Sequence, residues 1–175
     1  MELLIVVDMQ NDFIDGSLST AQSKEILPAV IKKVSEFKGN IIFTRDTHGK
    51  NYPDTSEGKK LPVIHCIKGT AGWQINQSLD CIRENKKCKV IDKPTFGSIS
   101  LYLYIEKLIA DGADIDKITL IGLCTDICVI SNAILLKSAF PEIPIEVDSS
   151  CCAGVSPESH IRALEAMKMC QIDII

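Results

Sequence analysis

The stretch ITLIGLCTDICV, residues 118–129, decides the fold because it predicts a buried strand that runs directly into a helix. The first turn of that helix carries Cys128. Free amide N–H groups and the positive end of a helix dipole favour a thiolate over a thiol, and they can also hold a developing oxyanion. A cysteine at an apolar strand–helix junction is otherwise a small buried hydrophobic residue, so this stretch alone leaves both interpretations open.

Five other apolar runs rich in isoleucine and valine share the character of this strand. None shows clear polar alternation, which is typical of strands that are buried on both faces of a sheet. In chain order, the six predicted strands are Leu3–Val7, Asn40–Thr44, Cys88–Ile91, Ile118–Ile121, Ile143–Val147 and Ile172–Ile175.

Helical patterns lie between these runs. The first follows a capping Ser23 and ends before Gly39, and the last has Pro157 in its first position. The alternation of strands and helices predicts a doubly wound α/β fold, with a mainly parallel six-stranded sheet and helices on both faces. The predicted helices cover 26–37, 99–110 and 126–137, and a fourth begins at Ser156.

Length and composition bound the class of protein. A chain of 175 residues is long enough for one substantial core and too short for two ordinary domains, so residues 1–175 are predicted to form a single domain. Its 46% hydrophobic and 24% charged residues are typical of a globular protein. A formal net charge of −4 gives no basic footprint for nucleic acid.

The chain start and the cysteines indicate the compartment. The segment MELLIVVDMQNDF has no basic leader, and its apolar run is too short for a signal peptide or a membrane span. We therefore expect a cytoplasmic protein with no membrane partner. The eight cysteines lie mostly in apolar contexts without CxxC spacing, which favours free thiols over disulfides or a structural zinc site.

Polar residues follow several of the predicted strands. Segment 47–70 contains glycine, proline and charged residues but no convincing long element, and such a loop in a compact domain is usually functional or disordered. Ligands of open α/β sheets bind beyond the carboxyl ends of the strands. Four segments therefore converge on one rim, and they bring Asp8, Asp46 with His48, Lys93 and Cys128.

Asp8, Lys93 and Cys128 each have a chemical use in such a cleft. Asp8 can accept the thiol proton and return it to a leaving amine, and Lys93 can hold both anions by charge. Cys128 can attack a carbonyl carbon. Taken singly, Asp8 is equally well a turn residue and Lys93 an exposed lysine.

Three motifs in this order resemble the isochorismatase-like cysteine hydrolase superfamily, in its nicotinamidase/pyrazinamidase-like branch. They are DMQNDF starting at Asp8, DKPTFGS around Lys93 and GLCTDICV around Cys128. The resemblance spans the chain and implies a Rossmann-like domain in which these three residues hydrolyse an amide. It also implies a cis peptide bond before Cys124, with the backbone N–H groups of Cys124 and Cys128 as an oxyanion hole.

A second set of residues is similar to the metal site of nicotinamidases. Asp46 and His48 lie in RDTH, and His65 lies in LPVIHCIKGT. One carboxylate and two imidazoles suit a divalent metal, with zinc expected first and iron or manganese as alternatives. By analogy with extra ligands in this branch, Glu57 or Asp54 in YPDTSEG is the fourth ligand.

The resembled reaction converts nicotinamide and water to nicotinate and ammonia through a cysteine thioester. In that reaction the metal holds the pyridine nitrogen, and Phe13 packs against the ring unless it only fills the core. Two departures leave another small amide or carbamoyl substrate open. Thr47 replaces an aromatic residue, and KKLPVI before His65 lacks the usual Gly-Pro-Trp-type lead. The family also implies a homo-oligomer, either a dimer or a tetramer.

Other cysteines raise a third hypothesis, a non-catalytic or redox-sensing binding protein. Its only specific indication is the adjacent pair Cys151-Cys152, which we otherwise expect to be two small residues in a strand-to-helix loop. Cys124 replaces the alanine common beside the cis bond and is expected to fill space. Trp73 is expected in the core or against a neighbouring subunit instead of on a substrate ring.

Overall fold

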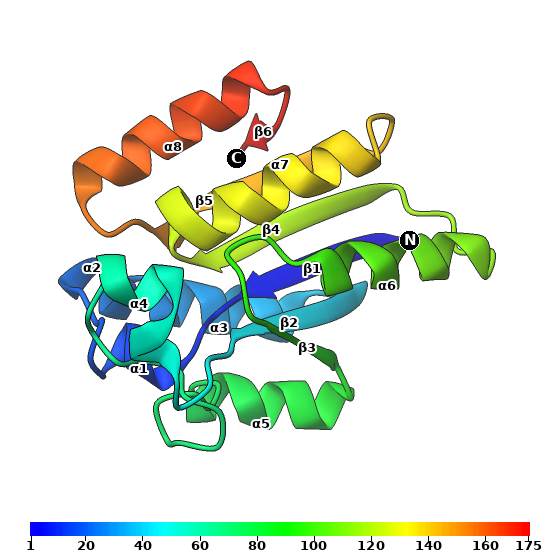
Figure 1. Ribbon diagram of the computed structural model, residues 1–175. Coiled ribbons are helices and arrows are strands. Elements are labelled where there is room, and N and C mark those ends of the chain that lie inside the picture. The colour runs from blue at the N-terminus through cyan, green and yellow to red at the C-terminus, as the bar shows by residue number, and fades with distance from the viewer.

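The computed structural model describes residues 1–175 and contains one sheet of six parallel strands (Figure 1). The spatial order is β3-β2-β1-β4-β5-β6, so the first half of the chain builds outward to one edge and the second half to the other. This confirms the doubly wound α/β prediction, and every strand pair is parallel. The strands are β1 (Glu2–Val7), β2 (Asn40–Asp46), β3 (Lys89–Lys93), β4 (Lys117–Leu123), β5 (Ile145–Ala153) and β6 (Asp173–Ile174).

Helices connect the strands, and four of the five that have ten or more residues lie where the hydrophobic pattern predicts a helix. The exception among the long ones is α5, which the pattern misses because Leu79 is its only buried residue. The helices are α1 (Asn11–Ile14), α2 (Ala21–Glu25), α3 (Leu27–Glu36), α4 (Ser56–Lys60), α5 (Gln77–Lys86), α6 (Ile99–Ala110), α7 (Ile130–Ala139) and α8 (Pro157–Met169). None of them combines the length and the apolarity that crossing a bilayer requires.

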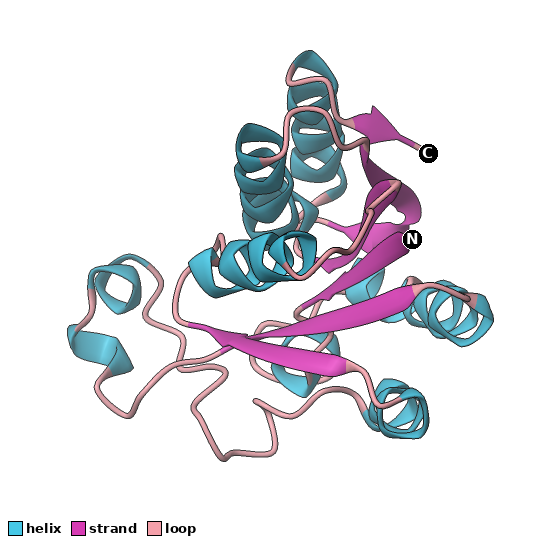
Figure 2. Ribbon diagram, turned by 90° about the vertical axis from the view of Figure 1, so that its right-hand side faces the viewer, coloured by secondary structure: helices cyan, strands magenta, loops and turns pink.

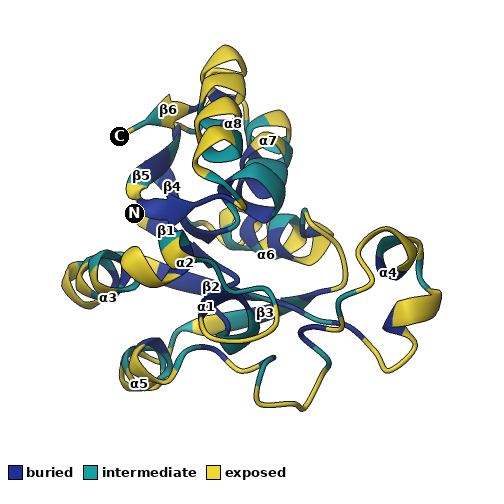
Figure 3. Cartoon of the chain, turned by 90° about the vertical axis from the view of Figure 1, so that its left-hand side faces the viewer, coloured by how far each residue is buried: buried dark blue, intermediate teal, exposed yellow.

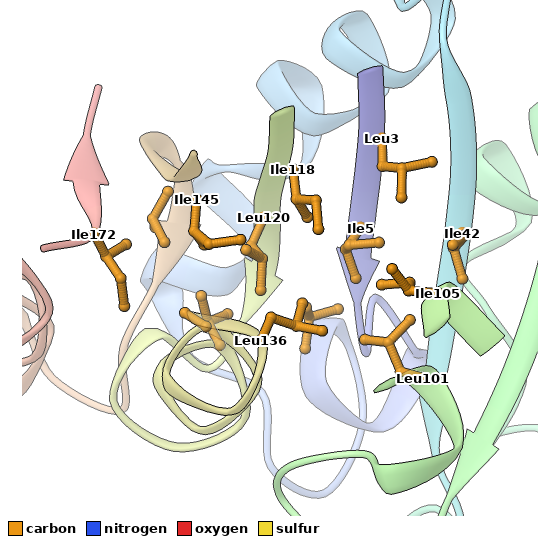
Figure 4. Packing of buried hydrophobic residues seen from close by; sticks show 14 of the residues in the cluster. Leu3, Ile5, Ile42, Leu101, Ile105, Ile118, Leu120, Leu136, Ile145 and Ile172 are labelled. Atoms are coloured by element: carbon orange, nitrogen blue, oxygen red, sulfur yellow. The ribbon is translucent and has the colours of Figure 1, made fainter. Parts of the chain in front are cut away.

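Both faces of the sheet are covered by helices (Figure 2). Within β1, Leu3 and Ile5 belong to one buried cluster, whereas Leu4 and Val6 belong to the other. Helices α6, α7 and α8 pack on the first face, and Figure 4 shows side chains of α6 and α7 against those of the strands. Helices α1, α3 and α5 pack on the second face. Because both faces are buried, the strands are continuous apolar runs.

The segment between β4 and α7 differs from the prediction. A single π-helical turn, Thr125–Val129, precedes α7, so Cys128 lies in this turn and not in the first turn of a regular helix. Such turns are rare and occur often at functional sites. Gly122 stands just before it with φ +115°, and a Cβ there would lie 2.1 Å from the Val7 carbonyl oxygen. Only glycine allows β4 to run this close to β1.

The prediction for Cys151 and Cys152 is wrong in its placement. Strand β5 extends to Ala153 because Cys152 and Ala153 pair with the end of β4, so both cysteines lie in the strand and not in a loop. Each thiol is free and only 3% exposed. Their burial limits the access of an oxidant to either thiol, which weighs against the redox-sensing hypothesis.

Segment 47–70 contains only a short 3-10 turn, Tyr52–Asp54, and α4, in keeping with the absence of a long predicted element. The part with α4 projects from the sheet and is largely exposed (Figure 3). The buried exceptions in this segment are His48, Tyr52, Gly58, His65 and Cys66. This segment therefore brings a few side chains back to the carboxyl edge of the sheet.

Candidate active site and metal centre

Asp8, Lys93 and Cys128 meet at the carboxyl edge of the sheet. Asp8 directly follows β1, Lys93 is the last residue of β3, and Cys128 lies in the turn after β4. Asp8 and Lys93 are inaccessible to solvent, and Cys128 is 5% exposed. Parallel strands end at the same edge, which explains why residues so distant in sequence come together.

Lys93 connects the other two side chains. Its Nζ lies 2.6 Å from Asp8 Oδ2 and 3.3 Å from Cys128 Sγ, and it also donates to the carbonyl oxygen of Thr95. Asp8 Oδ1 accepts a further hydrogen bond of 2.6 Å from Thr44 Oγ1. The buried ammonium therefore has an anionic partner and an additional acceptor, the arrangement that a buried charge requires.

Burial and neighbouring charges change the protonation of all three groups. Burial opposes the Lys93 ammonium, but the charges of Asp8, Cys128 and Asp46 outweigh it and raise the pKa of Lys93. Burial raises the pKa of the Asp8 carboxyl, although Lys93 acts to lower it. Burial and the charge of Asp8 also raise the pKa of Cys128 well above its usual value. The resting nucleophile is thus a thiol, which differs from the expectation of a thiolate favoured by a helix terminus.

Cys128 lines a cavity of about 190 Å³ whose walls are mostly apolar. Phe13, which is 9% exposed, and Cys124 also line it. The peptide bond between Leu123 and Cys124 is cis, as the sequence resemblance implies. The other lining residues are Leu18, Thr20, Leu61, Phe96, Ile127 and Val155, with Asp46, Glu57 and His65 on the polar side.

Three predicted metal ligands lie together beside this cavity. The ligand atoms of Asp46, His48 and His65 are all within 4.8 Å of one another. Oδ2 of Asp46 lies 2.9 Å from His48 Nε2 and 3.4 Å from His65 Nε2. Glu57 Oε1 lies 3.7 and 3.9 Å from the same two nitrogens, whereas Asp54 is exposed. Of the two alternatives for a fourth ligand, the structure brings only Glu57 to the cluster.

The protonation of this cluster suits a divalent cation. The Val63 carbonyl oxygen lies 2.7 Å from His65 Nδ1 and can only accept, so Nδ1 carries a proton and Nε2, 3.4 Å from Asp46 Oδ2, is the ring nitrogen that remains for a cation. His48 Nε2 is buried without a well-oriented hydrogen-bond partner. Burial acts to raise the pKa of Asp46, but the two neighbouring histidines and the charge of Lys93 outweigh it and lower the pKa of Asp46 below its usual value. A carboxylate and two imidazole nitrogens are a fitting donor set for zinc.

The motif DMQNDF contributes two further side chains that the sequence reasoning did not single out. Gln10 is fully buried, and its Nε2 donates to the Asp46 carbonyl at 2.9 Å while its Oε1 accepts from the Asp46 N–H at 2.7 Å. Asp12 Oδ2 accepts from the Cys66 N–H at 2.7 Å. Gln10 thus fixes the backbone of one predicted ligand, and Asp12 fixes the residue after His65. Asp8, Gln10 and Asp12 occupy alternate positions directly after a buried strand, and this pattern could have identified Gln10 and Asp12 from the sequence.

Only one of the two departures from the resembled pattern affects the cavity. Thr47 is not among the lining residues, and its Oγ1 accepts a hydrogen bond of 2.8 Å from Trp73 Nε1. Trp73 is 8% exposed and belongs to the core, which confirms one of the two expectations for it. Leu61, from the altered segment before His65, is a wall residue that is 37% exposed.

The profile of the isochorismatase domain matches residues 2–175. This chain belongs to the isochorismatase family. Among curated proteins, this isochorismatase-family chain is similar to the nicotinamidase of Saccharomyces cerevisiae, with 26% identity over all of this chain and 99% of the yeast protein. The resemblance inferred from the three motifs is therefore confirmed.

Solved structures of the family share the fold. The nicotinamidase of Bacillus subtilis superposes with a TM-score of 0.84 at 25% identity, covering 99% of this chain and 98% of the other. The pyrazinamidase of Pyrococcus horikoshii in complex with zinc superposes with a TM-score of 0.80 at 26% identity, with the same coverage of 99% and 98%. The predicted fold is therefore that of known isochorismatase-family structures.

Proposed function

We propose that this isochorismatase-family protein is a metal-containing cysteine amidohydrolase that converts nicotinamide and water to nicotinate and ammonia. The observation that carries the proposal is a single cavity lined by Cys128 and also by Asp46 and His65 of the candidate metal cluster. Asp8 and Lys93 are buried beside it, with Lys93 Nζ 2.6 Å from Asp8 Oδ2 and 3.3 Å from the sulfur of Cys128. The similarity to nicotinamidases supports a carboxamide substrate.

Acylation begins with proton transfer from the Cys128 thiol to the Asp8 carboxylate. Because the pKa of the resting thiol is raised, the proton leaves as the sulfur attacks the carboxamide carbon. Lys93, 3.3 Å from the sulfur, stabilises the negative charge that develops there. The carbonyl oxygen becomes an oxyanion, for which the backbone N–H groups of Cys124 and Cys128 are the proposed donors.

The tetrahedral intermediate then releases ammonia. The C–N bond breaks, Asp8 returns its proton to the departing nitrogen, and the acyl group stays on Cys128 as a thioester. Asp8 next takes a proton from water as the water oxygen attacks the thioester carbon. The C–S bond breaks, the sulfur recovers a proton from Asp8, and nicotinate leaves.

Asp46, His48 and His65, with Glu57 beside them, are the proposed holders of a divalent metal, with zinc first and iron or manganese as alternatives. A metal bound there supplies a Lewis acid for the ring nitrogen of the substrate. Phe13 lines the same cavity and is proposed to pack against the ring. Together these contacts orient the carboxamide toward Cys128, and orientation of this kind lowers the barrier substantially.

Ammonia release from nicotinamide, measured on protein whose metal content has been determined, tests the proposal. We expect turnover by the wild type and a loss of at least about a thousandfold in kcat for Cys128→Ala, because the thioester cannot form. Cys151→Ala is the matched control, since it removes another buried thiol outside the cavity. Turnover by Cys128→Ala would contradict the mechanism, and an active metal-free protein would contradict the metal role while keeping the cysteine cluster.

A different small amide or a carbamoyl compound is the second candidate substrate. It is favoured by Leu61 in the cavity wall and by Val155, which is 55% exposed at the same cavity. A panel of small amides ranked by kcat/KM separates the two candidates. Nicotinamide at the top of that ranking excludes the second candidate.

A further inference from the structure

Asn132 is a fully buried polar residue that the proposed mechanism does not use. It lies on α7, four residues after Cys128, and its Nδ2 donates to the Cys128 carbonyl oxygen at 2.7 Å. The same Nδ2 donates to the Phe96 carbonyl oxygen at 3.0 Å, and Oδ1 accepts from the Ser98 N–H at 2.9 Å. The orientation of the amide is unambiguous because the two carbonyls can only accept and the N–H can only donate.

Two of these three hydrogen bonds leave the helix and hold the loop between β3 and α6. The backbone of this loop comes close to α7, since a Cβ on Gly97 would lie 3.3 Å from the Ser131 carbonyl oxygen. Ser98 is also the N-cap of α6, where its Oγ accepts from the Leu101 N–H at 3.1 Å. Asn132 therefore determines both where this loop lies on α7 and where the next helix begins.

This loop forms part of the wall of the cavity at Cys128, in which the substrate is proposed to bind. Phe96 lines the cavity at Cys128 and also a neighbouring hollow of about 440 Å³. The Phe96 side chain is 45% exposed, so packing in the core does not fix its position. The hydrogen bond from Asn132 to the Phe96 carbonyl oxygen fixes the backbone of Phe96 instead. We propose that Asn132 is a positioning residue that places Phe96 against the ring of the bound amide. This inference rests on the proposed function.

Substitutions at Asn132 can separate this role from the bond to Cys128. Asn132→Ala removes all three hydrogen bonds. Asn132→Ser keeps a hydroxyl that can donate to the carbonyl four residues earlier, but that hydroxyl is too short to reach the loop. Ser138→Ala is the matched control, because Ser138 on the same helix makes only the analogous bond to the Ile134 carbonyl and is exposed.

The experiment measures KM and kcat for nicotinamide, together with the rate at which iodoacetamide alkylates Cys128, read by peptide mass spectrometry. We expect both Asn132 variants to raise KM about tenfold, with the alkylation rate within about twofold of wild type. A merely structural role would instead raise alkylation and lower kcat as the folded fraction falls, because unfolding exposes the buried Cys128 thiol and returns its pKa to the usual value. In a Phe96→Ala background, Asn132→Ala should raise KM by less than about twofold, because the residue that it positions is gone.

Four results would overturn the proposal: an unchanged KM in Asn132→Ala, a wild-type KM in Asn132→Ser, a full effect in the Phe96→Ala background, or a rise in Cys128 alkylation that parallels the loss of turnover. If Asn132→Ala does not fold, the Asn132→Ser comparison decides. A wild type that releases no ammonia from nicotinamide refutes the proposed function instead. The positioning role is then judged by the same KM comparison on the best amide of the panel.

Discussion

The motif DMQNDF supplies side chains to both halves of the candidate site. Asp8 lies beside Cys128 and Lys93, Gln10 hydrogen-bonds the backbone of the candidate metal ligand Asp46, and Asp12 hydrogen-bonds the backbone of Cys66, the residue after the candidate ligand His65. Groups that hydrogen-bond to metal ligands raise the affinity for the metal, because they restrict conformational freedom that the ligands would otherwise lose when the metal binds. One short segment after β1 therefore connects the position of Asp8, the proposed general base, to the position of the proposed metal.

Gln10→Ala is predicted to weaken metal binding by about 10- to 100-fold, because Asp46 loses both side-chain bonds to its backbone. The dissociation constant for zinc, measured by competition with a chromogenic chelator, checks this. Gln77→Ala on α5 is the control, since Gln77 is exposed. An unchanged zinc affinity in Gln10→Ala would show that Gln10 only fills the core.

At the scale of elements, the junction of β4 with its π-helical turn depends on the closeness of β4 to β1. Residues Val6 and Val7 of β1 pair with Ile121 and Gly122, and the chain then turns to place Cys128 over Asp8 and Lys93. Hydrophobic periodicity predicts that such strands exist, because it depends on local burial. It cannot predict that Gly122 adopts a positive φ where β4 approaches β1, or that a π-helical turn follows it.

Gly122→Ala is predicted to lose more than about 3 kcal/mol of unfolding free energy, because the new methyl group meets the Val7 backbone as well as an unfavourable φ. Gly112→Ala is the matched control. Gly112 has φ +96°, but a Cβ added there would have no atom within 4 Å, so this variant should lose only about 1 kcal/mol. Urea denaturation measures both. Equal losses would mean that φ strain alone, and not the contact between strands, requires glycine at residue 122.

At the scale of the whole molecule, an ion pair joins a helix and a strand that are far apart in the chain. Lys33 on α3 lies 2.8 Å from Asp148 on β5, and Asp148 is 8% exposed. Burial acts to raise the pKa of Asp148, but the hydrogen bonds from Lys33 and Ser150 outweigh it and lower the pKa. A carboxyl with a lowered folded-state pKa stabilises the fold above its unfolded-state pKa, and this stability is lost as pH falls through the folded-state pKa.

The unfolding free energy of the wild type is therefore predicted to fall more steeply than that of Asp148→Asn as the pH drops below about 4. Near neutral pH the variant should be less stable, because Lys33 loses its partner, and the two proteins should converge in acid. Urea denaturation at a series of pH values measures the difference, and Asp173→Asn at an exposed position is the control. Parallel curves for wild type and Asp148→Asn would contradict the role of this pair.

The amino-acid sequence was enough to predict the alternation of strands and helices, the family, and the identity of Asp8, Lys93, Cys128, Asp46, His48 and His65 as candidate site residues. These follow from burial patterns and short motifs, which are local in the chain. Only the folded chain shows that Glu57 and not Asp54 joins the candidate metal cluster, and that Leu61 and not Thr47 lines the cavity.

The folded chain is also what raises the pKa of the Cys128 thiol by burial and lets Asn132 hydrogen-bond two segments that are distant in the chain. These features depend on which segments pack against each other and on how completely they exclude water. Desolvation and contacts between segments far apart in the chain arise only when the whole sheet and its helices have assembled, so no local pattern could reveal them.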